Sequence, residues 1–333
     1  MQNRLYYLDI STTDPRYNLA LEQYVFDSLP RGHSFFLLWQ NDRAVIVGKH
    51  QNTYAEVNAQ YVREHGLYVV RRLSGGGAVY HDLGNLNFTF ICDLVPSEVI
   101  DYKKFCVPIV DTLKEFGVQA EFTGRNDMTI CGKKFSGNAQ YIRRGRVMHH
   151  GTILFSSDLS AMAQALHVDA AKLRTKGIRS VSSRVTNISE HLASNVPLST
   201  FRSALLTHIL RTCPSAPYLL TGQDCSAVQA LCQNRYATWE WNYGVSPECT
   251  IRKHRWVEGC GEVDAYLTIE HGLISGAKFY GDFFNLLDPG DLAARLIGVC
   301  PDREGISAAI QGLSISQYFI GLGREDFLEL LTV

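Results

Sequence analysis

The stretch Arg71-Arg-Leu-Ser-Gly-Gly-Gly-Ala-Val-Tyr-His-Asp-Leu-Gly-Asn85 decides how the chain folds around its functional residues. The segment 67–70 before it is apolar and the segment 86–91 after it alternates with period two, so the glycines connect two predicted strands. Three consecutive glycines carry a large backbone-entropy cost, which is typical of a loop whose main-chain N–H groups approach an anion closely. The planar guanidinium of Arg72 suits the same phosphate or carboxylate oxygens. A flexible turn between strands is the alternative interpretation.

The two common nucleotide-binding fingerprints do not fit this chain. The Rossmann pattern requires glycine where Tyr80 stands. The Walker pattern requires glycine where Asp127 stands and Ser or Thr where Lys134 stands. If a nucleotide binds, we therefore expect it to bind to another fold.

Outward from the loop, the first half of the chain mixes helix and strand patterns. The predicted elements are a helix at 18–26, strands at 35–39 and 44–47 joined as a hairpin, a helix at 105–116, and strands near 127–131, 134–140 and 147–155. The pattern turns helical from about 158 to 235. This order predicts an α/β fold of the α+β kind, in which helices follow a sheet.

A second domain is predicted after a linker-like segment near 246–252. Its elements are a hairpin of 265–269 and 273–279, followed by helical pieces near 290–299, 303–311 and 323–331. We therefore expect two domains, at 1–246 and 253–333.

Composition excludes several classes of protein. The 333 residues are 46% hydrophobic and 20% charged, as in ordinary globular proteins, which excludes a disordered or coiled-coil chain. Thirty-two Lys and Arg against 33 Asp and Glu give a net charge of -1, and the basic stretches are short and scattered. A general nucleic-acid binder is not expected.

Membrane and secretory signals are not seen in the sequence. The first ten residues turn polar before a signal-peptide core develops, and no later run approaches the ~18 apolar residues that a spanning helix needs. The nine cysteines are odd in number and contain no C-x-x-C pair, so we expect reduced thiols, mostly buried. A cytoplasmic protein is predicted.

The segment 124–138 is a second cluster of reactive side chains. Asn126 and Asp127 offer oxygens that suit Mg²⁺, and Gly132 marks a hairpin turn that presents Lys133 or Lys134 at the start of the next strand. With Phe135 in the core, Lys134 would point to the opposite face. The alternative is an ordinary turn and a solvated pair of lysines.

Two further segments carry polar groups of interest. His149 and His150 are adjacent on a predicted strand and point to opposite faces, so a shared metal site is not expected. One histidine is predicted to be a packed core group and the other to border a pocket. The segment 176–188 is rich in hydroxyls and arginine, and it is either a lid over a phosphate ester or a polar surface loop.

Taken together, these blocks resemble the lipoate-protein ligase A family. The matching motifs appear in the family's order: 71–85, 124–127, 134–137, 149–152 and 176–187. The likeness extends to 18–22, 48–52, 239–242 and a C-terminal accessory domain, so it spans nearly the whole chain. It implies a biotin/lipoate ligase-like catalytic domain with a mixed sheet, plus a small α/β C-terminal accessory domain.

The resemblance implies a two-step reaction. Lipoate and ATP, with Mg²⁺, would give enzyme-bound lipoyl-AMP and pyrophosphate, and a lysine of an acceptor protein would then attack the mixed anhydride. The implied acceptors are lipoyl domains of 2-oxoacid dehydrogenase E2 subunits and the glycine cleavage H protein. Such an enzyme binds neither nucleic acid nor membrane.

Site residues follow from the matching motifs. Nucleotide contacts are implied for Arg72, Gly77, Ala78, Val79, Tyr80 and Lys134. Lipoate contacts are implied for Ser74, Gly75, Gly76, His81, Lys134, Ser136 and His149. Lys134 would be the catalytic residue and Asp127 a ligand of Mg²⁺. Residues 71–77 would form the lipoate-binding loop and about 170–185 the loop that covers the adenylate.

Three rival functions differ from this one in kind. An octanoyltransferase of the same superfamily would use a cysteine nucleophile and no ATP, but Cys92, Cys106 and Cys131 match no nucleophile position. A biotin ligase would share the fold and show a different glycine-arginine loop. A non-catalytic protein that binds lipoate or a lipoyl domain would not need the combination of Arg72, the glycine loop and Lys134.

Overall fold

The computed structural model describes residues 4–94, 101–123, 126–166 and 184–332. Its contacts divide the chain into two compact units, a large one formed by Met1–Lys49 and Gly66–Thr238 and a small one formed by His50–His65 and Trp239–Val333. No pattern in the sequence indicated that 50–65 packs with the small unit. Within the described ranges, no helix has both the length and the apolar character that a membrane span requires.

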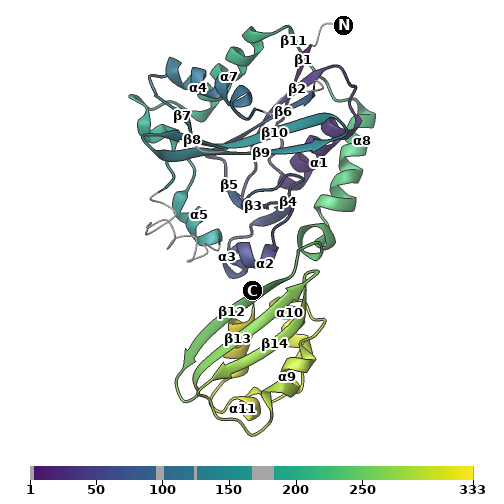
Figure 1. The fold of residues 1–333 in the computed structure, drawn as a ribbon, viewed down its shortest axis with the longest axis vertical. Coiled ribbons are helices and arrows are strands. Elements are labelled where there is room, and N and C mark those ends of the chain that lie inside the picture. The colour runs from purple at the N-terminus through teal and green to yellow at the C-terminus, as the bar shows by residue number, and fades with distance from the viewer. Residues whose placement is uncertain (1–3, 95–100, 124–125, 167–183, 333) are drawn as a thin grey trace. The chain divides into compact units, whose positions relative to one another are not determined.

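The large unit is built on an eight-stranded mixed sheet with the order β11-β1-β2-β6-β10-β9-β8-β7 (Figure 1). Its strands are β1 (Leu5–Asp9), β2 (Ser34–Trp39), β6 (Asn85–Asp93), β7 (Glu121–Thr123), β8 (Asp127–Ile130), β9 (Lys133–Arg143), β10 (Arg146–Leu154) and β11 (Ser215–Pro217). β1 runs parallel to both β2 and β11, and the remaining pairs are antiparallel. The predicted mixed α/β class is confirmed.

Helices cover both faces of this sheet. In Figure 1, α4 (Lys103–Glu115) and α7 (Leu198–Thr212) lie on one face, and α1 (Pro15–Ser28) lies on the other. The core beneath α4 and α7 includes Phe88 and Phe135. The other helical elements among this unit's described residues are α5 (Leu159–Ala165), η1 (Ile188–His191), α8 (Gly222–Leu231) and the π-helical turn η2 (Cys232–Tyr236).

The predicted hairpin of 35–39 and 44–47 is wrong. β2 pairs with β1 and β6 in the large sheet, whereas β3 (Ala44–Val47) belongs to a separate three-stranded sheet with β4 (Tyr68–Arg71) and β5 (Val79–His81). Both strands are apolar on both faces, and such runs do not specify their partner by pattern. β11 was also missed, since three residues are too few to show a period.

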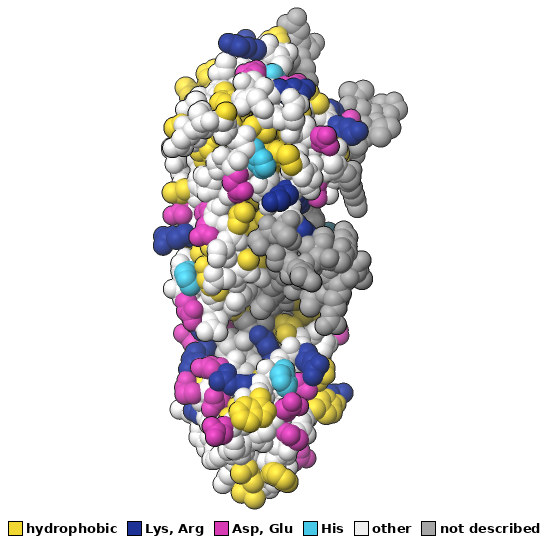
Figure 2. Space-filling model, turned by 90° about the vertical axis from the view of Figure 1, so that its left-hand side faces the viewer, with side chains coloured by type: hydrophobic (Ala, Val, Ile, Leu, Met, Phe, Trp, Pro, Cys, Tyr) yellow, Lys and Arg dark blue, Asp and Glu magenta, His cyan; other side chains and the backbone are white. Residues whose placement is uncertain are grey.

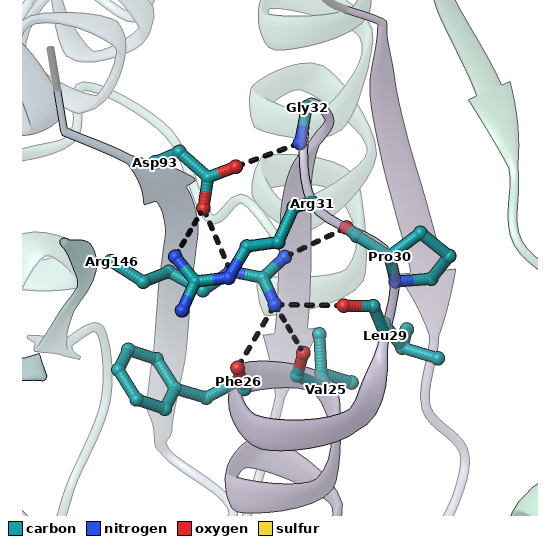
Figure 3. Close-up of polar contacts among 8 residues, drawn as sticks. All are labelled: Val25, Phe26, Leu29, Pro30, Arg31, Gly32, Asp93 and Arg146. Carbon is teal, nitrogen blue, oxygen red and sulfur yellow. Dashed lines mark hydrogen bonds and ion pairs between the residues drawn. The ribbon is translucent and has the colours of Figure 1, made fainter. Parts of the chain in front are cut away.

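Arg146, at the start of β10, fastens the end of α1 to the large sheet (Figure 3). Its Nη1 donates to the carbonyls of Phe26 and Leu29 at 2.9 Å, which are among those that a helix end leaves unpaired. Asp93 lies 3.5 Å from Arg146 Nε and accepts from the Gly32 N–H at 2.7 Å. Burial lowers the pKa of the Arg146 guanidinium, which Asp93 opposes.

The small unit packs helices on a three-stranded antiparallel sheet. The strands are β12 (Cys249–Val257), β13 (Gly261–Glu270) and β14 (Leu273–Gly281), and the helices are α2 (Thr53–Glu56), α3 (Ala59–Glu64), η3 (Glu240–Gly244), α9 (Pro289–Arg295), α10 (Arg303–Ala309), α11 (Ile315–Tyr318) and α12 (Arg324–Leu331). The predicted β13–β14 hairpin is confirmed, and its turn residues His271 and Gly272 have the positive φ values of 49° and 77°. On the face that Figure 2 shows, acidic and basic side chains intermingle.

All nine cysteines lie within the described residues and are free thiols, as predicted. The expectation that most are buried is wrong. Three are buried, four are half-buried, and Cys131 and Cys225 are exposed.

Candidate active site

A cavity in the large unit lies between the glycine-rich loop and the face of the large sheet that α1 covers. Its apolar wall includes Leu19, Trp39 and Ile46. The rest of its lining comes from the loop and β5, from β6, from the residue before β8, and from β9 and β10: Arg72, Gly76, Gly77, Ala78, Val79, His81, Asn87, Asn126, Lys134, Gly137, Asn138, Ala139, His150, Gly151 and Thr152. An apolar pocket with a few convergent polar groups is the usual form of a small-molecule site.

Arg72 holds the glycine loop in shape. Its Nη2 donates to the carbonyls of Gly75 at 2.7 Å and Gly77 at 2.9 Å, and its Nη1 donates to the carbonyl of Ile46 at 3.1 Å. Burial lowers the pKa of the Arg72 guanidinium to about 10, so it stays charged at neutral pH. The side chain therefore organises the loop as well as bordering the cavity.

Glycine is required where the loop approaches Gly48, the residue that follows β3. Gly76 has φ +94°, and a Cβ there would lie 3.0 Å from Arg72 Nη2. A Cβ on Gly48 would lie 2.1 Å from the carbonyl oxygen of Gly76, a distance that real contacts do not show. The close approach of these two backbones is what the run of glycines permits.

A chain of buried hydrogen bonds links Arg72 to Glu22 on α1. Arg72 Nε donates to Ser74 Oγ at 3.0 Å, and Ser74 Oγ lies 2.6 Å from His150 Nε2. His150 Nδ1 lies 2.8 Å from Glu22 Oε1, which also accepts from the hydroxyl of Thr89 at 2.7 Å. Because the carboxylate of Glu22 only accepts, His150 Nδ1 carries the proton that faces it, and in the neutral ring Nε2 then accepts the hydroxyl proton of Ser74.

His81 presents a neutral N–H group at the cavity. Asn41 Oδ1 accepts from Asn18 Nδ2 at 3.0 Å, which directs Asn41 Nδ2 toward His81 Nδ1 at 3.1 Å. Nδ1 is thus the acceptor and Nε2 carries the proton. Nε2 is buried and has no partner among the described residues. Burial, with Arg72 and His150 nearby, lowers the pKa of His81 to about 3.

The β8–β9 hairpin brings Lys134 to the cavity. Its turn residues Cys131 and Gly132 have the positive φ values of 49° and 76°, as the sequence predicted for Gly132. Ser136 pairs with Met128 and Lys134 pairs with Thr129, so Phe135 is an unpaired extra residue, a β-bulge. Phe135 is fully buried in the core and Lys134 lines the cavity, which confirms their opposite directions.

Lys134 is fixed at both its backbone and its ammonium. Its N–H donates to the carbonyl of Arg184 at 2.8 Å, and its carbonyl accepts from the N–H of Thr186 at 2.9 Å. Its Nζ lies 2.7 Å from Asp127 Oδ1. Within the described ranges, no three His, Cys, Asp or Glu side chains lie close enough to hold a metal ion. One carboxylate that already faces an ammonium does not fit a resident Mg²⁺, and a Mg²⁺ role for Asp127 stays a prediction.

Two predicted lipoate contacts, Ser136 and His149, lie on the core face of the sheet, and the bulge explains the first of them. Period two would place Ser136 on the same face as Lys134, but the extra residue puts Ser136 on the core face. His149 lies on that face as well, with its Nε2 3.9 Å from Cys106 Sγ and its Nδ1 3.0 Å from Gln140 Nε2. His150, rather than His149, lines the cavity. The expectation of one core histidine and one pocket histidine is confirmed.

The remaining predicted residues surround the same cavity. Arg72, Gly76, Gly77, Ala78, Val79, His81 and Lys134 line it. Ser74, Gly75 and Tyr80 belong to the loop or to β5 without being part of the lining. Residues 124–125 and most of the predicted cover of the adenylate, at about 170–185, lie outside the described residues.

Glu22 and Trp39 are site residues that the analysis of the sequence did not single out. Trp39 lines the cavity, and its Nε1 donates to Thr89 at 3.0 Å. Glu22 is buried in the middle of α1. Its signal was present, since Asn18 and Glu22 are polar residues at helical spacing on a face that is otherwise apolar.

Comparison with protein families accounts for both units. A model of the lipoyl protein ligase A/B catalytic domain matches residues 14–210. A model of the bacterial lipoate protein ligase C-terminus matches residues 246–331. Both parts of the chain thus match one class of ligase.

Individual relatives agree with this result. The lipoate-protein ligase LplJ of Bacillus subtilis is 42% identical over 321 residues, which cover 96% of this chain and 97% of that protein. A bipartite lipoate protein ligase from Thermoplasma acidophilum, solved in a study of the ligase and its E2 lipoyl domain, has a TM-score of 0.64 at 29% identity and covers 75% of this chain and 100% of that one. A lipoate-protein ligase A bound with ATP has a TM-score of 0.62 at 27% identity and covers 74% and 100%. The chain belongs to the lipoate-protein ligase family.

Proposed function

We infer that the chain is an ATP-dependent lipoate-protein ligase, which forms lipoyl-AMP and then transfers the lipoyl group to a lysine of an acceptor protein. The observation that carries this function is the cavity in which the glycine loop, Arg72 and Lys134 meet. The relative from B. subtilis is named a lipoate-protein ligase, and the similar ligase A structure holds ATP. Mg²⁺ would enter with ATP as part of the substrate complex.

In the first step, the carboxylate of lipoate attacks the α-phosphorus of ATP and pyrophosphate leaves. Negative charge builds on the phosphoryl oxygens, so a fixed cation beside them lowers the barrier. Lys134 supplies that cation from β9. The loop residues 77–80 and Arg72 hold the nucleotide, and the hydrogen bonds from Arg72 to the loop keep that surface in place before ATP arrives.

The acyl chain of lipoate lies against the apolar side of the cavity. Leu19, Trp39 and Ile46 supply the apolar wall. The Nε2–H of His81 supplies a hydrogen-bond donor that the described residues leave unpaired. Excluding water from this space protects the mixed anhydride from hydrolysis.

In the second step, the acceptor lysine attacks the acyl carbon of lipoyl-AMP. The ammonium of Lys134 stabilises the oxyanion that develops while AMP leaves, and no covalent acyl-enzyme is needed. The acceptors are lipoyl domains of 2-oxoacid dehydrogenase E2 subunits and the glycine cleavage H protein. The solved T. acidophilum ligase, studied with its E2 lipoyl domain, supports the first of these. A cytoplasmic location is part of this proposal, because ATP and these acceptors are found there.

A transferase that uses a cysteine nucleophile and no ATP is the rival function. Cys106 is the thiol to consider as a nucleophile, since its Sγ lies 3.9 Å from His149 Nε2, as in a cysteine–histidine pair. Burial raises the pKa of Cys106 to about 12, and burial lowers the pKa of His149 to about 3. A nucleophilic cysteine requires the opposite shift of its own pKa.

The deciding experiment is lipoate-dependent exchange of labelled pyrophosphate into ATP, with octanoate and biotin as carboxylate controls. We expect exchange with lipoate and none with biotin. Absence of exchange, together with acyl transfer from an octanoyl carrier protein, would move the chain to the transferase function.

A further inference from the structure

Two features of the hairpin hold Asp127 against Lys134, the member of their ion pair that lines the cavity. Asp127 and Lys134 stand on paired strands, and the bulge at Phe135 turns Lys134 onto the face where Asp127 lies. Gly137 is the residue directly opposite Asp127. A Cβ on Gly137 would lie 2.8 Å from Lys134 Nζ, so the lysine can lie across this strand only because Gly137 has no side chain.

This pair is open to an incoming group. The side chains of Asp127 and Lys134 are each 39% exposed. An ammonium has three N–H donors, so Lys134 can keep its bond to Asp127 while the other two contact the acyl carbonyl and the phosphate. Asp127 Oδ1 lies 2.7 Å from Nζ, so a carbonyl that binds to Nζ would also have the Asp127 carboxylate as a neighbour.

The transfer step produces a proton that the roles assigned so far leave without an acceptor. The other titratable side chains that surround the cavity in the described part are occupied or buried. Glu22 is buried and accepts from Thr89 and His150. Both ring nitrogens of His150 are hydrogen-bonded, and the Nδ1 of His81 is taken by Asn41. Asp127 combines exposure, negative charge and contact with Lys134.

We propose that Asp127 is the proton acceptor of the transfer step, a role that rests on the proposed ligase function. The neutral ε-amine of the acceptor lysine attacks the acyl carbon, a C–N bond forms and the C–O bond to the phosphate breaks. AMP leaves with that electron pair. The nitrogen becomes strongly acidic once it bonds to carbon, and its proton passes to the Asp127 carboxylate and from there to water.

The test separates the two steps in the full-length enzyme. Adenylation is measured as lipoate-dependent pyrophosphate exchange, and transfer is measured as a single turnover from preformed lipoyl-AMP to a saturating apo form of an E2 lipoyl domain. In Asp127→Asn we expect exchange within about threefold of the wild type and transfer slower by about 100-fold, the lower end of the range for general base catalysis. Asp127→Glu should restore part of the transfer rate.

The matched control is Glu121→Gln, which removes an exposed carboxylate from the neighbouring strand β7 and should change neither step. Equal losses in both steps of Asp127→Asn would show that Asp127 only positions Lys134. A raised Mg²⁺ requirement for exchange would show a metal ligand instead, and an unchanged transfer rate would also overturn the proposal. If the wild type itself gives no exchange, the proposed function fails rather than this role.

Discussion

In the part of the chain that the structure describes, two cationic side chains line the cavity, and the protein holds them in opposite ways. Arg72 is buried, and its guanidinium donates to a serine and to backbone carbonyls of the loop that surrounds it. Lys134 is 39% exposed, and its ammonium faces a single carboxylate across a strand. Several hydrogen bonds fix the Arg72 guanidinium, whereas the Lys134 ammonium can exchange its one carboxylate partner for a substrate.

This difference separates two tasks that a ligase must perform. Donors that are fixed in advance bind a phosphate without reorganisation, which suits the surface that receives ATP. A cation that serves two successive reactions must face an acyl carboxylate first and an acyl carbonyl later, which suits an exposed lysine on a stiff strand. We therefore expect substitutions at Lys134 to act on rate and substitutions around Arg72 to act on binding.

Lys134→Ala should have the largest effect and should leave the fold intact. Loss of the ammonium removes the fixed charge beside the reacting phosphate, so pyrophosphate exchange should fall by about 1,000-fold. Lys133→Ala removes the neighbouring exposed lysine and serves as the control. Normal exchange in Lys134→Ala would remove this residue from the mechanism.

Arg146→Met tests the attachment of α1 to the large sheet, on which the buried hydrogen bonds of Arg72 depend. It leaves the carbonyls of Phe26 and Leu29 without their donor and Asp93 without its buried partner, so the free energy of unfolding should fall by about 3 kcal/mol. Urea titration measures this loss. Arg143→Met, at an exposed arginine, should change the same quantity by less than about 0.5 kcal/mol. Similar losses in both variants would contradict the anchoring role.

Gly76→Val and Gly48→Ala test whether the loop must approach β3 closely. Each adds a side chain that meets backbone or Arg72, so the loop must move and lipoate and ATP should bind about 100-fold more weakly. Calorimetric titration with each ligand measures the change. Gly222→Ala is the matched control, because a Cβ there meets nothing within 4 Å. Unchanged lipoate affinity in Gly76→Val would count against the loop as a binding surface.

The buried histidine on the core face should make stability depend on pH. Burial lowers the pKa of His149 to about 3 in the folded protein, from an ordinary value of 6.5. The unfolded chain therefore takes up this proton first, so the stabilisation is complete above pH 6.5 and is lost as the pH falls toward 3. Between pH 7 and pH 5 the wild type should lose about 2 kcal/mol more than His149→Gln.

Urea titrations at the two pH values measure that difference. Equal losses in the wild type and in His149→Gln would contradict the shift.

Local patterns were enough to predict the elements that depend on neighbours in sequence. The hairpin that presents Lys134 was predicted because Gly132 and the apolar residues that flank it lie within a few positions of one another. The pairing of β2 and β3 with different sheets was not predicted, because two short apolar runs give no information on distant partners. The resemblance to the family added the roles, which spacing alone leaves open.

Side-chain direction was the part of the site that the sequence could not supply. The resemblance implied lipoate contacts for His149 and Ser136, and the side chains of both lie on the core face. For Ser136 the cause is an unpaired residue, which no period-two pattern reveals. For His149 the alternation was correct, but choosing between two adjacent histidines requires knowing which face the cavity occupies.

The bulge at Phe135 means that the hairpin needs one more residue in β9 than in β8. In a regular ladder that kept Ser136 opposite Met128, Phe135 would stand opposite Thr129 at the cavity and Lys134 would point into the core. A designer who transplants this hairpin into another scaffold must therefore copy its residue count between the turn and Gly137. A perfectly paired copy with the same sequence would place a phenylalanine where the reaction needs a charge.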